Sequence, residues 1–114
     1  MKKSTFVSTI GLLLLSLNVF ADPHFDEAIK HATAAVEHGK MGHASVLVEH
    51  ATPALEHALA GALNAKGLAK SHADNAITDL EEAIKHGKEG DKHAGVATTY
   101  AETALEHLKA ANKK

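Results

Sequence analysis

Histidines recur every seven residues through most of this chain, and this period restricts its possible folds more than any other feature. The first series flanks the segment Gly39–Gly42 and comprises His24, His31, His38, His43, His50 and His57. The second series flanks Gly87–Gly90 and comprises His72, His86, His93 and His107, with Asp79 and Tyr100 in the two remaining places. Seven residues are close to two helical turns, so the repeat predicts α-helices.

Almost every segment after residue 23 follows one heptad of the form His, Ala, two variable residues, Ala, an aliphatic residue, then Glu or Lys. Ten such heptads begin at residues 24, 31, 43, 50, 57, 72, 79, 93, 100 and 107. At 100° per residue, positions two, five and six lie within about 100° of one another and form one apolar stripe per helix. Position one lies about 80° from the centre of the stripe, which puts the histidines at the border between core and water.

The start and stop signals predict four helices, at about 22–39, 43–64, 71–87 and 91–111. Asp22 is a suitable N-cap for the first helix, with Pro23 in its first turn, and Asp91 is a suitable N-cap for the fourth. Glycines at 39, 42, 67 and 87 end helices and turn the chain. Pro53 lies inside the second helix, where it is expected to bend or break the helix, with a fresh start at Thr52 as the alternative.

Short connections between helices of similar length predict an all-α, antiparallel, up-down-up-down four-helix bundle, with two loosely associated helical hairpins as the alternative. The predicted core residues other than alanine are Ile29, Val36, Leu47, Val48, Leu55, Ile77, Leu80, Ile84, Val96, Leu105 and Leu108. Most other stripe positions are alanine, so the metal-free protein should be only marginally stable.

The chain divides into residues 1–21, predicted to be a secretory signal peptide, and residues 22–114, predicted to be one histidine-rich four-helix metal-binding domain. Two lysines, a short apolar run and a small residue at Ala21 are typical of a cleaved leader, which indicates an exported protein with no membrane span after cleavage. Cleavage leaves ten lysines against fourteen acids, a net charge of −4, so nucleic acid is not an expected partner. The lack of cysteine excludes thiolate metal sites and covalent c-type haem.

Two histidines seven apart on one helix are separated by about 10.5 Å along its axis, too far to share a metal with bonds near 2 Å. Antiparallel neighbours would solve this by pairing histidines across a hairpin. The expected pairs are His38–His43, His31–His50 and His24–His57 in the first hairpin, and His86–His93, Asp79–Tyr100 and His72–His107 in the second. Glu27 and Glu82 share the histidine face and are candidate secondary oxygen ligands.

Imidazole and carboxylate ligands suit Cu(II), Zn(II) and Ni(II), and the affinity order at such sites peaks at Cu(II). Cu(I) prefers sulfur, and Met41 is the one methionine after the predicted leader. Cu(II) is therefore the predicted metal, with Ni(II) and Zn(II) as further candidates. Binding requires neutral imidazole, so affinity should fall in acid.

The leader, the chain length and the repeated His-Ala-x-x-Ala-aliphatic-[Glu/Lys] heptad resemble the periplasmic small metal-binding proteins described from ammonia-oxidising bacteria. The resemblance covers essentially all of residues 22–114. It implies a periplasmic monomer that binds several divalent transition-metal ions, prefers copper and serves copper homeostasis. The ligands it implies are the ten repeat histidines, His24, His31, His38, His43, His50, His57, His72, His86, His93 and His107. Asp79 and Tyr100 depart from the repeat, so unequal occupancy of the sites is expected.

Two other functions are compatible with a helical bundle of this kind. Carboxylate-bridged di-metal enzymes use Glu-x-x-His motifs that face the core, but this chain has no Glu-x-x-His motif, so catalysis is not predicted. A pH-responsive interaction module, opened by repulsion between charged histidines, is the alternative to metal binding. Storage, detoxification and delivery to a copper-accepting protein are the alternative physiological roles.

Overall fold

The computed structural model describes residues 22–113, which form four α-helices and one short 3-10 helix. The elements are α2 (Pro23–Lys40), α3 (Ala44–Ala62), α4 (Gly67–Gly87), η2 (Asp91–His93) and α5 (Ala94–Ala111). The predicted leader, residues 1–21, lies outside the described residues. Within residues 22–113, none of the helices is both long and apolar enough to cross a bilayer.

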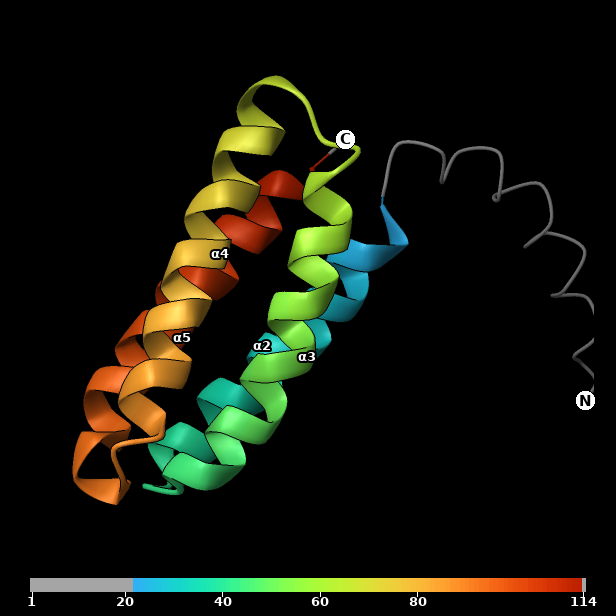
Figure 1. Cartoon of the computed structure of the whole chain (residues 1–114). Helices are drawn as coiled ribbons and strands as arrows, with labels where there is room; N and C mark the ends of the chain where they lie inside the picture. Colours follow the sequence, from blue (N-terminus) through green and yellow to red (C-terminus); the bar gives the residue numbers. More distant parts are fainter. Residues whose placement is uncertain (1–21, 114) are drawn as a thin grey trace, which may run out of the picture.

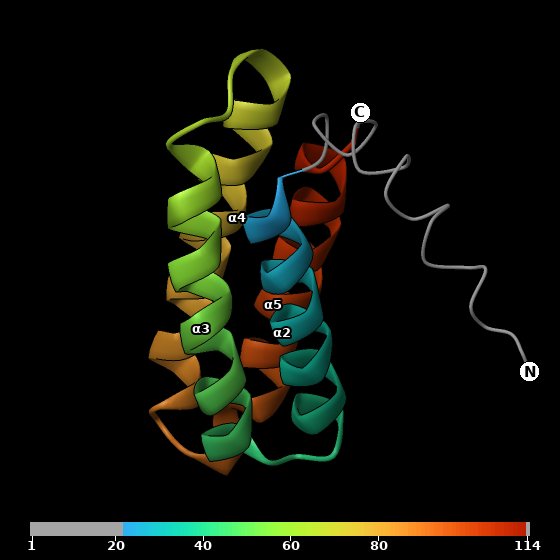
Figure 2. The same ribbon diagram turned by 90° about the vertical axis from the view of Figure 1, so that its right-hand side faces the viewer.

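The four helices pack side by side, and each one contacts two principal neighbours (Figures 1 and 2). α2 packs against α3 and α5, and α4 packs against α3 and α5. The α2–α3 and α4–α5 turns lie at one end of the bundle, and the α3–α4 connection lies at the other (Figure 1). The predicted all-α four-helix bundle is confirmed. The alternative of two loosely associated hairpins is wrong, because both cross-hairpin interfaces are extensive.

Helix N-termini are capped from two different sources. Asp22 caps α2 as predicted, with its Oδ1 accepting a hydrogen bond from the His24 amide at 2.8 Å. Asp91 does not cap its own helix: its Oδ1 accepts from the Ala44 amide at 3.0 Å and so caps α3, 47 residues away. The prediction for Asp91 was wrong because this residue begins η2, three residues before α5 starts at Ala94. A residue of the second hairpin thereby satisfies a backbone donor at the N-terminus of α3, in the first hairpin.

Two predicted helix features differ in the structure. α3 remains one helix through Pro53, so the predicted break or fresh start at Thr52 does not occur. Proline removes only one backbone donor, and the fully buried Ala51 and Ala54 on either side hold the helix against the core. α4 begins at Gly67 rather than near Ser71, which adds one helical turn.

The core consists of positions two and five of the heptads, and alanine fills most of them. Its largest fully buried side chains are Leu47, Leu80 and Leu108. Four of the predicted core residues are buried, namely Val36, Leu47, Leu80 and Leu108. Six more are partly buried against this core, namely Ile29, Val48, Leu55, Ile77, Ile84 and Leu105. Val96 is 46% exposed, which contradicts the prediction: it occupies position four of its heptad, and the buried Thr98 takes the aliphatic position six.

Each helix has two different edges beside its alanine-rich centre. Positions one and six lie about 70° on either side of the midpoint between positions two and five, so histidine and aliphatic side chains flank the core on opposite edges. Val48, at a position six, packs close to Gly87 of α4, where its Cγ2 would be 2.5 Å from an added Cβ. The aliphatic edge of α3 therefore faces the other hairpin, which leaves the histidine edges to meet within each hairpin.

Close helix contact requires glycine at Gly61. A Cβ added there would lie 2.7 Å from Cε1 of the buried Phe25. We expect Gly61→Ala to reduce the free energy of unfolding by about 1–3 kcal/mol through overpacking. Gly95→Ala is the matched control, because no heavy atom lies within 4 Å of a Cβ added to this α5 residue. The control should gain up to about 1 kcal/mol from helix propensity. Urea unfolding measures the free energy of unfolding of both variants. Equal changes in the two would contradict the conclusion that the Gly61–Phe25 contact leaves no room for a side chain.

Candidate metal centre

The histidine edges of α2 and α3 meet and form one staggered row of rings. Successive ring centroids along the row are 5.4 Å apart for His24–His57, 5.9 Å for His57–His31, 6.4 Å for His31–His50 and 5.2 Å for His50–His38. The prediction that imidazoles from neighbouring helices face one another is therefore confirmed. Within the row, every ring except the two at its ends has a histidine neighbour on both sides.

The register of this row differs from the predicted one: α2 and α3 are offset by about half of the spacing between successive histidines of one helix. His24–His57 is paired as predicted, but His31 lies closer to His57 than to His50. His38 stacks on His50, with only 7° between the ring planes, and the predicted His38–His43 pair is not among the ring contacts of residues 22–113. His43 is exposed at the N-cap of α3, where its backbone angles (φ −97°, ψ 85°) are not helical.

Two pairs of imidazole nitrogens lie close enough for one ion to bind both. Nδ1 of His24 is 3.2 Å from Nδ1 of His57, and Nδ1 of His72 is 3.1 Å from Nδ1 of His107. Two ligand atoms bonded to one metal at about 2.0–2.1 Å are about 2.8–3.4 Å apart for angles between square and tetrahedral. Both pairs fall in this range. They occupy equivalent places in the two halves of the repeat, with similar ring tilts of 32° and 33°.

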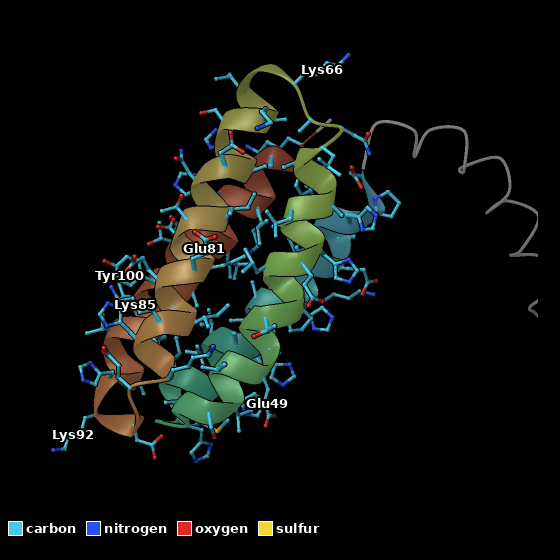
Figure 3. The ribbon with its side chains drawn as sticks, in the orientation of Figure 1. Glu49, Lys66, Glu81, Lys85, Lys92 and Tyr100 are labelled. Carbon is cyan, nitrogen blue, oxygen red and sulfur yellow. The ribbon has the colours of Figure 1, made fainter. Side chains whose placement is uncertain are left out.

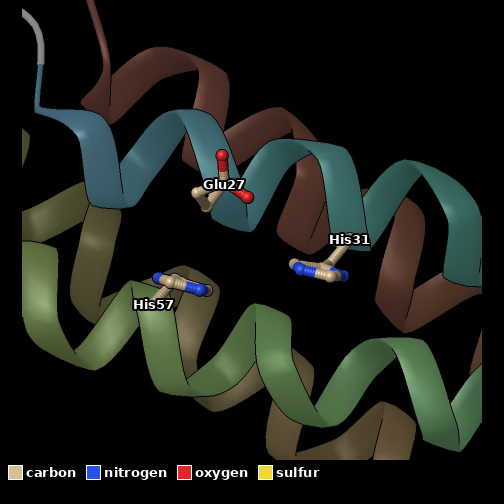
Figure 4. Close-up of side chains that lie close together, drawn as sticks. All are labelled: Glu27, His31 and His57. Atoms are coloured by element: carbon tan, nitrogen blue, oxygen red, sulfur yellow. The ribbon is translucent and has the colours of Figure 1, made fainter.

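Glu27, His31 and His57 form a group of three potential ligands in the first hairpin. One potential ligand atom from each residue lies within 4.8 Å of the others. Glu27 and His31 extend from α2 and His57 from α3, and the two imidazole rings lie in the space between these helices (Figure 4). Glu27, predicted as a secondary oxygen ligand, is thus beside the histidine row. Its Oε2 also contacts Lys30 Nζ at 3.3 Å.

The second hairpin has no continuous row, because Asp79 and Tyr100 replace two of the histidines. Tyr100 stacks on His86 with ring centroids 5.6 Å apart, as His50 stacks on His38 in the first hairpin. Tyr100 lies at the outer edge of this hairpin (Figure 3). Burial raises the pKa of the Asp79 carboxyl, and the nearby His107 opposes this shift only in part. The second hairpin therefore has separate histidine sites at its two ends.

His86, Glu89 and His93 form the second group of three potential ligands, at the α4–α5 turn. Oε1 of Glu89 is 3.4 Å from Nδ1 of His86 and 3.3 Å from Nδ1 of His93. Sequence reasoning missed Glu89 as a candidate ligand. The available signal was its position three residues after one histidine and four before the next, the same spacing that singled out Glu27.

Comparison with known proteins agrees with the ligand geometry. The family model for small metal-binding proteins matches residues 1–111 of the chain. This chain belongs to the small metal-binding protein family. No curated protein sequence matches it.

In this small metal-binding protein, eight of the ten repeat histidines are half-buried at the core border, and His24 and His43 are exposed. Nδ1 of His38 and Nδ1 of His86 are buried without a hydrogen-bond partner. These two residues are equivalent in the repeat, each being the last histidine before its turn. An unpaired buried nitrogen costs free energy unless something binds it, so its recurrence at both turns indicates a ligand-binding role.

The substitution Asp79→Asn tests the electrostatics of the second hairpin in the metal-free protein. Burial raises the pKa of Asp79 above its ordinary value of 3.8, so the folded state holds this proton more tightly than the unfolded state. The protonated carboxyl therefore does not destabilise the folded protein in acid. As the pH rises through the folded-state pKa, the carboxyl becomes charged and increasingly lowers the free energy of unfolding. We expect Asp79→Asn to melt at a higher temperature than wild type at pH 7. That difference should disappear at pH 3, and a less stable variant at pH 7 would contradict the assignment.

Proposed function

We propose that this member of the family binds several divalent transition-metal ions through its hairpin histidines, with Cu(II) preferred over Ni(II) and Zn(II). The role that follows is copper buffering or storage in the periplasm. The observation that carries the proposal is the pair of short Nδ1–Nδ1 distances, 3.2 Å and 3.1 Å, at equivalent places in the two hairpins. Membership of the small metal-binding protein family supports the same general function.

The nature of the ligands supports the choice of metal. The groups that the fold brings together contain imidazole nitrogen and carboxylate oxygen, a set that suits Cu(II), Ni(II) and Zn(II) and gives Cu(II) the highest affinity. Met41 is 57% exposed at the first turn. A single exposed thioether is a poor basis for Cu(I) binding, which favours several sulfur ligands.

The position of the ligands supports buffering rather than catalysis. They lie along the borders of the bundle, where ions can enter and leave from solvent, and the bundle centre is filled by alanine and leucine. Neighbouring histidines in the first hairpin share partners, so each added ion competes with the previous one for ligands. We therefore expect graded binding over a range of affinities, which suits a buffer. The predicted leader, residues 1–21, supports export to the periplasm.

Calorimetric titration with Cu(II) at pH 7, together with metal analysis of the washed complex, tests the proposal. We expect more than one bound Cu(II) per chain, weaker binding of Zn(II) and Ni(II), and release in acid as the imidazoles become protonated. Fewer than one tightly held ion, or a preference for Mg(II), would refute the assignment. Acid-induced opening without any bound metal would instead favour the pH-responsive module.

A further inference from the structure

The α4–α5 turn has features that the rest of the histidine system lacks. Glu89 directs one oxygen, Oε1, between the Nδ1 atoms of His86 and His93, at 3.4 Å and 3.3 Å. Both distances match the separation of about 3.3–3.4 Å between two ligand atoms of one tetrahedral ion with bonds near 2.0–2.1 Å. Three ligands from one short segment thus lie near coordinating positions, and the fourth position remains open to solvent or another ligand.

The imidazole of His86 has no competing hydrogen bond at the nitrogen that lies near Glu89. Nδ1 of His86 is buried and has no hydrogen-bond partner. Its other nitrogen, Nε2, faces Oε1 of Glu82 at 3.7 Å. With an ion on Nδ1, the proton of His86 lies on Nε2 and points toward the Glu82 carboxylate, the arrangement in which the second ring nitrogen of a metal-binding histidine usually donates to an acceptor. Glu82 thus lies on the side of the His86 ring opposite the ion and contacts the ring without binding the ion itself.

Glu89 is also less engaged elsewhere than Glu27 of the first hairpin. Glu27 contacts Lys30, and His57 beside it is also paired with His24. Among the ion pairs of residues 22–113, Glu89 contacts only the two histidines of its own group. An ion at this turn therefore displaces no lysine and competes with no neighbouring histidine pair.

The same turn contributes a hydrogen bond to the other hairpin. Asp91, two residues after Glu89 and two before His93, caps α3 through the Ala44 amide at 3.0 Å. Gly90, between Glu89 and Asp91, has a φ of +110°, which L side chains rarely adopt. An ion that joins His86, Glu89 and His93 restricts the backbone on both sides of Asp91. Ion binding should therefore hold the cap in place.

We propose that His86, Glu89 and His93 form a discrete site for a single divalent transition-metal ion, which fills before the histidine row and fixes the turn that caps α3 through Asp91. This inference rests on the proposed metal-binding function and adds an order of filling and a structural role. The equivalent turn of the first hairpin has Met41 where the second has Glu89, and it lacks residues equivalent to Asp91 and Lys92. The repeat therefore supplies this site once.

The order of filling is tested by adding Cu(II) in small steps to the 15N-labelled protein and recording amide spectra. Paramagnetic broadening should appear first at residues 86–93 and reach the row of α2 and α3 only at higher copper ratios. Glu89→Gln, which preserves shape and removes the charge, should lower the affinity for the first ion at least about tenfold, since loss of an outer partner alone costs about 10- to 100-fold. Glu81→Gln, at an exposed acid of α4, is the matched control.

The structural role is tested by hydrogen exchange at the Ala44 amide with one equivalent of Zn(II). We expect slower exchange on Zn(II) addition in wild type, and loss of this effect in Asp91→Ala even though Zn(II) still binds at the turn. Broadening that begins at His24 and His57, or Zn(II) binding at the turn without slower exchange at Ala44, would overturn the proposal. A protein that binds no Cu(II) or Zn(II) at any ratio would instead refute the proposed function, so the two failures are distinguishable.

Discussion

Saturation with Cu(II) at pH 7 should raise the melting temperature of the metal-free protein by about 10 °C or more. The core is small and rich in alanine, with Leu47, Leu80 and Leu108 as its largest fully buried side chains, so its own contribution to stability is limited. An ion that binds only the folded state at 100 times its dissociation constant adds about 2.7 kcal/mol. For a domain of this size, each kcal/mol raises the melting temperature by about 4–8 °C.

Two controls make this result specific. Mg(II) at the same concentration should leave the melting curve unchanged, because it prefers oxygen ligands and retains its water. A chelator added after copper should restore the metal-free curve, which excludes irreversible copper damage. A rise in melting temperature below about 2 °C at saturating Cu(II) would mean that the histidine pairs of the folded protein do not bind the ion. Even one site filled at 100 times its dissociation constant should raise the melting temperature several times more than that.

The helices and their edges follow from the sequence because they depend on local periodicity. A seven-residue repeat with alanine at positions two and five fixes which side of each helix is buried, and position one then lies at the border. His24, His31, His50 and His57 accordingly meet across the first hairpin. Val96 was misassigned because its residue type was considered without its heptad position. In position four it faces solvent, as the repeat itself requires.

The features that the sequence does not specify depend on how separate segments meet. The half-step stagger of the histidine row is set by the length of the first turn and by the axial offset of the helices, and neither appears in the spacing of the repeat. The cap from Asp91 to Ala44 joins residues 47 positions apart. The three-residue group around Glu89 requires the particular path of the α4–α5 turn, including the positive φ of Gly90.

The substitution His57→Ala should remove more copper than any other single histidine substitution in the first hairpin. Its Nδ1 is 3.2 Å from Nδ1 of His24, and its ring also belongs to the group with Glu27 and His31. Without His57, the remaining members of both groups lie on α2 alone, where histidines one heptad apart cannot share an ion. We expect a loss of about one Cu(II) per chain and at least a tenfold weaker affinity in this hairpin, measured by metal analysis and calorimetry.

The internal repeat supplies the comparison variants. His107 is equivalent to His57 but is paired with His72 and has Asp79 in place of the second histidine neighbour. His107→Ala should therefore disturb one site where His57→Ala disturbs two overlapping ones. His43→Ala should leave copper binding nearly unchanged, because this exposed N-cap residue lies outside the row. Circular dichroism should first establish that helix content is unchanged in all three variants. An equal loss of bound copper from all three would then show that mobile histidines bind copper independently of the row, because only a fixed arrangement gives His57 more partners than His43.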